Sequence, residues 1–138
     1  MTKYYFGYGM NTNYHSMKSI CPNSKDLGAA TLSNHKLRFA LYADIVPTPN
    51  EMVHGVLWEI TTECLRMLDM REGYPNYYDR KIVKVNYNGV ELDAWVYYMQ
   101  PGNELAPPLD YYSTMCCEGY REHNVDTKQL YEALNFDK

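Results

Sequence analysis

The chain has 138 residues and a formal net charge of −4 at pH 7, a size typical of one domain with its own hydrophobic core. The acidic balance argues against a nucleic-acid partner, because a basic excess is what displaces the counterions of a polyphosphate. No apolar run approaches the roughly 18 residues of a membrane span, and no basic-then-apolar signal opens the chain. We therefore expect a single domain over residues 1–138, in the cytoplasm, with no nucleic-acid or membrane partner.

The first predicted strand runs into a turn with binding potential. Residues 3–8 are aromatic and β-prone, and Gly9 to Asn13 combine glycine with residues that cap helices. A short helix then starts at Asn13 and ends at Cys21-Pro22. Such a junction leaves backbone N–H groups pointing one way, which can hold an anion or an oxyanion. Many strand–turn–helix junctions bind nothing, so the pattern alone does not decide.

The middle of the chain predicts mostly strands. Residues 27–32 and 37–42 read as strands around a Ser33-Asn34 turn, and prolines with Asn50 end the second. Residues 52–60 form another strand, in which Gly55 indicates a bulge or a close backbone approach. Asn-Gly between two alternating runs predicts a tight hairpin. Its strands are 80–87 and 90–99, around Asn88-Gly89.

A helix with an unexpected carboxylate precedes the hairpin. Thr61 or Thr62 can cap it, and Gly73 supplies the left-handed residue that ends many helices. Its apolar stripe consists of Cys64, Leu65, Met67 and Leu68. Glu72 falls in the last turn, where the helix dipole disfavours negative charge. It is either an exposed glutamate at a small energetic cost, or a carboxylate whose pKa is raised for proton exchange near neutrality.

Two further helices are predicted near the end of the chain. One covers about residues 109–118 and ends at Gly119. The other begins at a capping box, Asp126 to Gln129, with Leu130, Tyr131 and Leu134 on one face. Six strands and three or four helices make an α+β domain, and a barrel-like antiparallel sheet would leave the fewest open edges.

The cysteines and histidines are not spaced like a metal site. No CxxC pattern and no i, i+4 histidine pair occurs. We expect no metal, and four free thiols that pack as small hydrophobes: Cys21, Cys64, Cys116 and Cys117. Fifteen tyrosines are many for this length. Because tyrosine joins apolar area to a hydroxyl, some of them should line a polar cavity.

Four segments together resemble the γ-glutamylcyclotransferase superfamily. Tyr5-Phe6-Gly7-Tyr8-Gly9-Met10-Asn11 is similar to its first-strand motif, aromatic-x-Tyr-Gly-Ser-Asn. Val53-His54-Gly55-Val56-Leu57-Trp58 resembles a later strand, and Leu68-Asp69-Met70-Arg71-Glu72-Gly73 resembles its Leu-Asp-x-x-Glu-Gly block. Ala106-Pro107-Pro108, followed by Tyr112 and Gly119, is similar to its substrate-side helix. Each segment alone is weak evidence, but their shared order and spacing extend nearly from end to end.

The resemblance implies a six-stranded, mostly antiparallel β-barrel with flanking helices. It also implies conversion of a γ-glutamyl amide to 5-oxoproline and a free amine, without a cofactor. Glu72 matches the catalytic carboxylate, and Tyr8, Gly9, Met10 and Asn11 match the loop that receives the γ-glutamyl group. Tyr78 and Tyr112 match tyrosines beside the cavity. The implied partner is a small γ-glutamyl compound, whose amine half could be an amino acid, a polyamine, a peptide lysine or glutathione.

The sequence departs from the family pattern at two positions. Met10 stands where serine is usual, and Leu109 where many members have serine after the prolines. If the loop acts through backbone N–H groups, the first change costs little. If the serine hydroxyl contacts substrate, recognition shifts. Met10 therefore keeps open an alternative, a non-catalytic binding protein that retains the γ-glutamyl or small-molecule pocket on the same scaffold.

Overall fold

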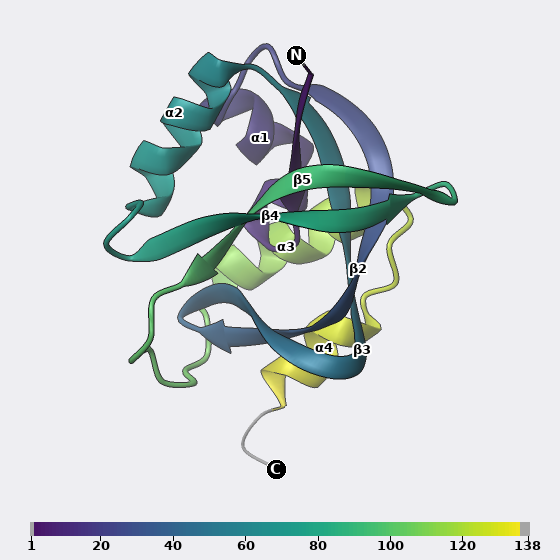
Figure 1. Cartoon of the computed structure of the whole chain (residues 1–138). Helices are drawn as coiled ribbons and strands as arrows, with labels where there is room; N and C mark the ends of the chain where they lie inside the picture. The colour runs from purple at the N-terminus through teal and green to yellow at the C-terminus, as the bar shows by residue number, and fades with distance from the viewer. Residues whose placement is uncertain (1, 136–138) are drawn as a thin grey trace.

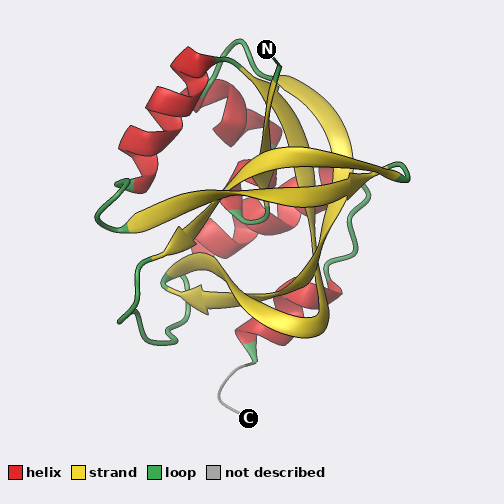
Figure 2. Ribbon diagram, viewed as in Figure 1, coloured by secondary structure: helices red, strands yellow, loops and turns green. Residues whose placement is uncertain are grey.

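Five strands close into a barrel in the computed structural model, which describes residues 2–135 (Figures 1 and 2). The strands lie in the order β1-β3-β2-β4-β5 around the barrel. Every neighbouring pair is antiparallel except β1 and β5, which pair in parallel with Tyr5 opposite Trp95 and so close the sheet. The strands are β1 Lys3–Gly7, β2 Lys25–Ala40, β3 Tyr42–Ile60, β4 Tyr78–Tyr87 and β5 Val90–Met99.

The barrel has one strand fewer than the six expected, because predicted breaks turned out to be bends. The pairing of β2 with β3 shifts between Ser33 and His35, which lie opposite Met52 and Pro47. Pairing resumes beyond this shift, so the predicted strand 27–32 and residues 37–40 of the next predicted strand are one strand, β2, whereas Tyr42 begins β3. The real turn lies at Leu41, whose φ of 71° is left-handed.

The hairpin of β4 and β5 forms as predicted. Asn88 and Gly89 have φ angles of 50° and 83°, the paired positive values that a two-residue turn of this kind requires. The ladder runs without a shift from Tyr87 opposite Val90 to Tyr78 opposite Met99. This continuous ladder fixes where Tyr78 and the end of β5 stand relative to the rest of the barrel.

Helices cover the barrel on more than one side (Figure 1). They are the 3-10 helix η1 Met10–Thr12, and α1 Tyr14–Ile20, α2 Thr62–Glu72, α3 Asp110–Glu122 and α4 Lys128–Leu134. In Figure 1, α1 and α2 lie together near the start of β1, whereas α4 lies at the opposite end of the view. Within residues 2–135, no helix has both the length and the apolar character that crossing a bilayer requires.

The two C-terminal helices differ from their predictions at Gly119 and at Gln129. Gly119 does not end a helix but lies inside α3, where an added Cβ would stand 2.2 Å from Thr12 Oγ1. Glycine is needed there because α3 packs directly on η1. Gln129 does not complete a capping box. Its side-chain amide instead exchanges two 2.7 Å hydrogen bonds with the His54 backbone of β3. On α4, Leu130 is buried but Tyr131 is exposed.

Two clusters of buried side chains form the core. One fills the barrel, with Phe6, Phe39 and Leu57 fully buried in it. The second lies between the barrel wall and the pair α1 and α2, and contains Trp58 and Leu68. The close approach expected at Gly55 is present, since a Cβ there would lie 2.4 Å from the Gly7 carbonyl oxygen. Burial of both clusters holds the end of β1 against α2.

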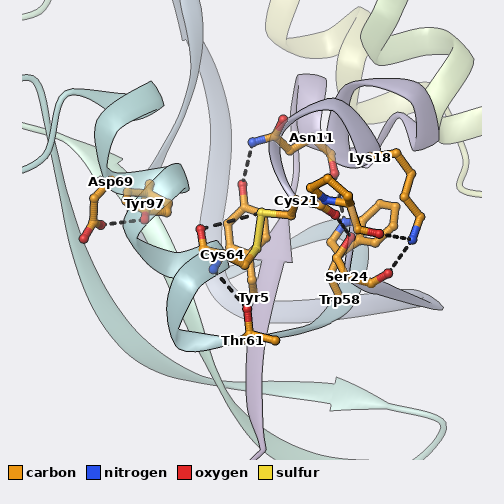
Figure 3. The surroundings of a disulfide bond; sticks show 11 residues. Tyr5, Asn11, Lys18, Cys21, Ser24, Trp58, Thr61, Cys64, Asp69 and Tyr97 are labelled. Carbon is orange, nitrogen blue, oxygen red and sulfur yellow. Dashed lines mark hydrogen bonds between the residues drawn. A yellow bond between two sulfur atoms is a disulfide. The ribbon is translucent and has the colours of Figure 1, made fainter.

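A disulfide joins Cys21 to Cys64, so the expectation of four free thiols was wrong (Figure 3). It ties the end of α1 to the first turn of α2, across 43 positions of sequence. Cys116 and Cys117 are free, as the awkwardness of pairing neighbours suggested. Structural disulfides are typical of oxidising compartments, so this pair lends no support to the cytoplasmic location, which stays a prediction.

Protein prepared without reductant and then denatured should therefore show two reactive thiols, rising to four after reduction. Replacing Cys21 and Cys64 together by serine should lower the free energy of unfolding by up to about 4 kcal/mol, because the open loop gains entropy in the unfolded chain. Thiol titration and denaturant unfolding measure both effects. Cys117→Ser is the control and should remove one reactive thiol. Four reactive thiols without reductant would contradict the pairing.

Candidate active site

One cavity of about 360 Å³ opens where the end of β1, the end of α2 and the start of α3 meet. All seven site residues predicted from the sequence line it: Tyr8, Gly9, Met10, Asn11, Glu72, Tyr78 and Tyr112. Eight of the fifteen tyrosines line it too, as their number suggested. The cavity thus gathers residues that lie as much as a hundred positions apart in the chain.

The cavity has a buried floor and an exposed mouth. We call the floor the buried lining residues, which are Tyr5, Tyr8, Gly9, Asn11, Ala43, Tyr78 and Tyr97. We call the mouth the apolar lining residues exposed by 45% or more, which are Leu41, Tyr42, Leu109 and Tyr111. Met10, Glu72 and Tyr112 also line the cavity and are intermediate in exposure between floor and mouth. A ligand that enters therefore passes two leucines and two tyrosine rings before it reaches the buried tyrosines of the floor.

Glu72 is carried by α2, whose two ends form as predicted. The Thr61 hydroxyl caps the helix by accepting a 3.0 Å hydrogen bond from the Cys64 N–H. Gly73 ends it with a φ of 69°. Leu65 and Leu68 anchor it in the core, whereas Met67, expected on the same stripe, is 42% exposed. The carboxylate is therefore held at the negative end of the helix dipole.

The Glu72 carboxyl has the raised pKa that the functional interpretation requires. Burial raises its pKa from 4.5 to about 7, and the nearby positive charge of Arg71 only partly opposes this. Within residues 2–135, no group hydrogen-bonds to this carboxylate. Its negative charge in turn raises the pKa of Tyr5, whose own burial is the larger cause. The carboxyl can exchange a proton near neutral pH.

The turn after β1 presents backbone amides to the cavity. Its first N–H with a carbonyl partner is that of Thr12, which donates to Gly9 O at 3.2 Å. Within the described part of the chain, the amides of Gly9, Met10 and Asn11 have no such partner. Burial raises the pKa of the Tyr112 hydroxyl well above its usual value. The amides of Ala43 and Met10 face this hydroxyl and lower the pKa by a smaller amount. Amides without a carbonyl partner can donate to an anion.

The side-chain amide of Asn11 is held at both ends. Its Nδ2 donates to the Tyr5 hydroxyl at 3.0 Å (Figure 3). Its Oδ1 accepts from the Ser16 hydroxyl at 3.1 Å. Its carbonyl accepts a 2.9 Å hydrogen bond from the Trp58 ring nitrogen. These three hydrogen bonds tie Asn11 to β1, α1 and β3, so the asparagine fixes the shape of the turn.

Ala43 links the two tyrosines predicted beside the cavity. Its carbonyl accepts a 2.6 Å hydrogen bond from the Tyr78 hydroxyl, and its N–H donates to the Tyr112 hydroxyl at 3.1 Å. A Cβ on Gly9 would stand 2.7 Å from the Ala43 Cβ. Gly9 is therefore required by close packing, not by its φ of −116°. An alanine in a strand carries no sequence signal, so this residue was missed.

Asp69, in the block that ends at Glu72, fixes the helix to the barrel. It accepts a 2.7 Å hydrogen bond from the Tyr97 hydroxyl of β5 and forms an ion pair with Arg80 of β4. Arg80 also stacks 4.2 Å from the Tyr74 ring centre. Tyr5 and Tyr97, like Ala43, are floor residues that sequence reasoning missed. Their alternation on β1 and β5 marks one face of each strand, but not that these faces meet.

Within residues 2–135, no three histidine, cysteine or acidic side chains lie close enough together to hold a metal ion. What the cavity does hold is one carboxylate with a raised pKa, a set of backbone amides and several tyrosine hydroxyls. These groups can move a proton and stabilise an oxyanion at neighbouring positions.

Comparison with known proteins gives a consistent result. A family described as "Gamma-glutamyl cyclotransferase, AIG2-like" matches residues 5–116. A Methanocaldococcus jannaschii protein, named provisionally as a gamma-glutamylcyclotransferase, is 31% identical over 103 residues, covering 70% of this chain and 83% of its own. Human gamma-glutamylcyclotransferase is 27% identical over 135 residues, covering 88% and 71%. A solved structure titled "Gamma-glutamyl cyclotransferase" superposes with a TM-score of 0.87 at 26% identity, over 98% of this chain and 88% of that one.

The raised pKa of Glu72 predicts a stability cost that depends on pH. Between pH 4.5 and about 7 the unfolded chain has released this proton while the folded chain keeps it, so stability falls as pH rises and then levels off. Glutamine does not titrate. Relative to wild type, Glu72→Gln should therefore gain up to about 3 kcal/mol of unfolding free energy between pH 4 and pH 8.

Chemical unfolding of both proteins at several pH values measures this gain. Glu63→Gln, in the exposed first turn of the same helix, is the control for losing a carboxylate at the surface. A difference between Glu72→Gln and wild type that stays constant with pH would contradict the raised pKa.

Proposed function

The chain belongs to the AIG2-like gamma-glutamyl cyclotransferase family and is an enzyme of that type, and we propose that it converts a γ-glutamyl amide to 5-oxoproline and a free amine, with Glu72 moving the proton. One observation carries this assignment. The carboxyl with a pKa of about 7 and the amides of the Gly9 to Asn11 turn line the same cavity, so both could contact one small substrate.

The substrate supplies its own nucleophile in this reaction. Its α-nitrogen attacks the γ-carbonyl carbon, and the new C–N bond closes a five-membered ring. The amide bond to the leaving nitrogen then breaks, and no water or cofactor is consumed. The enzyme must hold the glutamyl chain folded, and orientation of this kind contributes much of a rate enhancement. A cavity of about 360 Å³ with a buried floor is suited to that task.

Glu72 can serve both proton transfers. As a carboxylate it removes one proton from the α-ammonium, and this proton passes to solvent. During the attack it takes a second proton from the same nitrogen and, as the acid, delivers it to the leaving nitrogen, which departs as the neutral amine. A pKa near the working pH keeps both forms populated, which suits a group that must act as base and acid in turn. The neighbouring tyrosines stay protonated, because burial raises the pKa of Tyr78 well above its usual value.

The oxyanion of the tetrahedral intermediate requires donors, and the amides of Gly9, Met10 and Asn11, which have no carbonyl partner in the described residues, are the candidates. One well-placed donor is worth about 3–4 kcal/mol of transition-state stabilisation. The Met10 side chain is not needed for this role, since its sulfur lies 3.9 Å from the Tyr111 hydroxyl at the mouth. That placement favours an active enzyme over the non-catalytic alternative that the missing serine suggested.

Glu72→Gln should abolish release of 5-oxoproline while leaving the protein folded, with a loss of at least about 10²-fold, because glutamine keeps the shape but cannot carry the proton. In the wild type, kcat/KM should fall about tenfold per pH unit below pH 7, as the carboxylate becomes protonated. A panel of γ-glutamyl amides with detection of 5-oxoproline measures both, with Glu63→Gln as control. Near-normal turnover by folded Glu72→Gln would remove Glu72 from the mechanism.

Two neighbouring positions in the turn should respond very differently to substitution. Met10→Ser should keep kcat/KM within roughly tenfold, about 1.4 kcal/mol, because the backbone donors remain. Gly9→Val should reduce it by more than about 10²-fold, since its Cβ would collide with Ala43 and displace those donors. Circular dichroism checks that both variants fold. If the wild type is inert and Met10→Ser switches turnover on, the binding-protein alternative is correct.

A further inference from the structure

The burial gradient of the cavity sets the direction of a bound substrate. This inference rests on the proposed function, which places the γ-glutamyl group at the amides beyond β1. Those amides adjoin the floor, where the hydroxyls of Tyr8 and Tyr78 are also buried. Glu72 is intermediate in exposure between floor and mouth, and the scissile amide must lie beside it. The leaving half of the substrate therefore points outward and meets the mouth residues.

Arg71 is the one cationic side chain that lines the cavity within residues 2–135. It is exposed, it precedes Glu72 in the last turn of α2, and it lies close enough to lower the pKa of that carboxyl. Two other arginines near the site are already paired, Arg38 with Asp44 and Arg80 with Asp69. In the described residues Arg71 forms no ion pair. An exposed arginine is usually only solvated, but this one faces a cavity.

The mouth residues are apolar, and one of them, Leu41, has an unfavourable backbone conformation. Leu41 has a left-handed φ of 71°, which is unfavourable for a branched residue. Its N–H donates to Ala106 O at 3.1 Å, which holds the turn. Leu109 and Tyr111 are 69% and 62% exposed on the facing side. Exposed apolar side chains gathered at one opening are typical of a binding surface.

We propose that Arg71 pairs with a carboxylate on the leaving half, and that the mouth selects a leaving amino acid with a large apolar side chain. In an α-amino acid the carboxylate is one bond from the carbon attached to the leaving nitrogen. With that nitrogen at Glu72, the carboxylate lies on the side of the adjacent Arg71, and the side chain reaches Leu41, Leu109 or Tyr111. A polyamine has no carboxylate, and its second ammonium would be repelled by Arg71.

Three ligands separate these contributions. γ-Glutamyl-phenylalanine has both the carboxylate and the ring, γ-glutamyl-phenethylamine lacks only the carboxylate, and γ-glutamyl-alanine lacks only the ring. The variants are Arg71→Gln and Arg71→Lys, with Arg66→Gln as the matched control, since Arg66 is exposed on the same helix and pairs with Glu63. We measure kcat/KM for 5-oxoproline release, and also dissociation constants in the Glu72→Gln background, which do not depend on turnover.

Wild type should prefer γ-glutamyl-phenylalanine over γ-glutamyl-phenethylamine by about tenfold, the effect of one partly solvated charged hydrogen bond. Arg71→Gln should abolish this ratio, Arg71→Lys should keep part of it, and Arg66→Gln should leave it unchanged. Loss of the ring should cost about fivefold in all four proteins.

The ratio of kcat/KM for γ-glutamyl-phenylalanine to that for γ-glutamyl-phenethylamine distinguishes this role from others that Arg71 could have. An equal loss for both ligands in Arg71→Gln would mean that Arg71 acts on the glutamyl half or on Glu72, and it would overturn the proposal. A wild type without the carboxylate preference would overturn it too. If no ligand is turned over, the proposed function fails, and the dissociation constants still decide the role of Arg71. If no ligand binds, both proposals are wrong.

Discussion

The structure depends on holding one carboxylate where its charge is unfavourable. Glu72 lies at the negative end of α2 and is partly buried, and both conditions disfavour its ionised form. The cost, up to about 3 kcal/mol when the carboxyl is ionised, must be offset elsewhere. Helix α2 is accordingly fastened along its length. The Thr61 cap and the Cys64 disulfide hold its start, Leu68 is buried at its middle, and the contacts of Asp69 with β4 and β5 hold its end.

A second constraint is a set of three buried tyrosines whose hydroxyls donate to backbone carbonyls. Tyr8 donates to Tyr97 O at 2.7 Å, Tyr78 donates to Ala43 O at 2.6 Å, and Tyr120 donates to Tyr8 O at 2.6 Å. Each bond satisfies a buried polar group and joins elements that are distant in the chain. The result is a cavity that is shaped before any ligand arrives, which lowers the entropic cost of ordering a flexible glutamyl chain.

The disulfide and two glycines determine how the turn after β1 packs against its neighbours. Cys21 closes α1, which follows the turn, onto α2, while Gly119 lets α3 pack against η1 itself. Gly9 admits the Ala43 Cβ to within contact of the turn. The backbone of the turn is therefore packed against α3, Ala43 of β3 and, through α1 and the disulfide, α2. This arrangement places chemical demands on backbone geometry more than on side-chain identity, which is consistent with methionine at position 10.

The sequence alone determined the local features. Asn88-Gly89 predicted the hairpin, and Asn13, Thr61 and Gly73 predicted helix ends. The motif blocks predicted the family and seven of the residues that line the cavity. Each of these signals lies within a few neighbouring residues, which is why the sequence alone shows it. Only the tertiary structure decided what depends on contacts between distant segments. The barrel has five strands where six were predicted, and Cys21 is bonded to Cys64. Gln129 hydrogen-bonds to the His54 backbone and does not form a capping box. Three residues that the sequence did not indicate line the cavity: Ala43, Tyr97 and Arg71. These choices depend on which surfaces meet when the barrel closes, and packing of that kind overrides local preference.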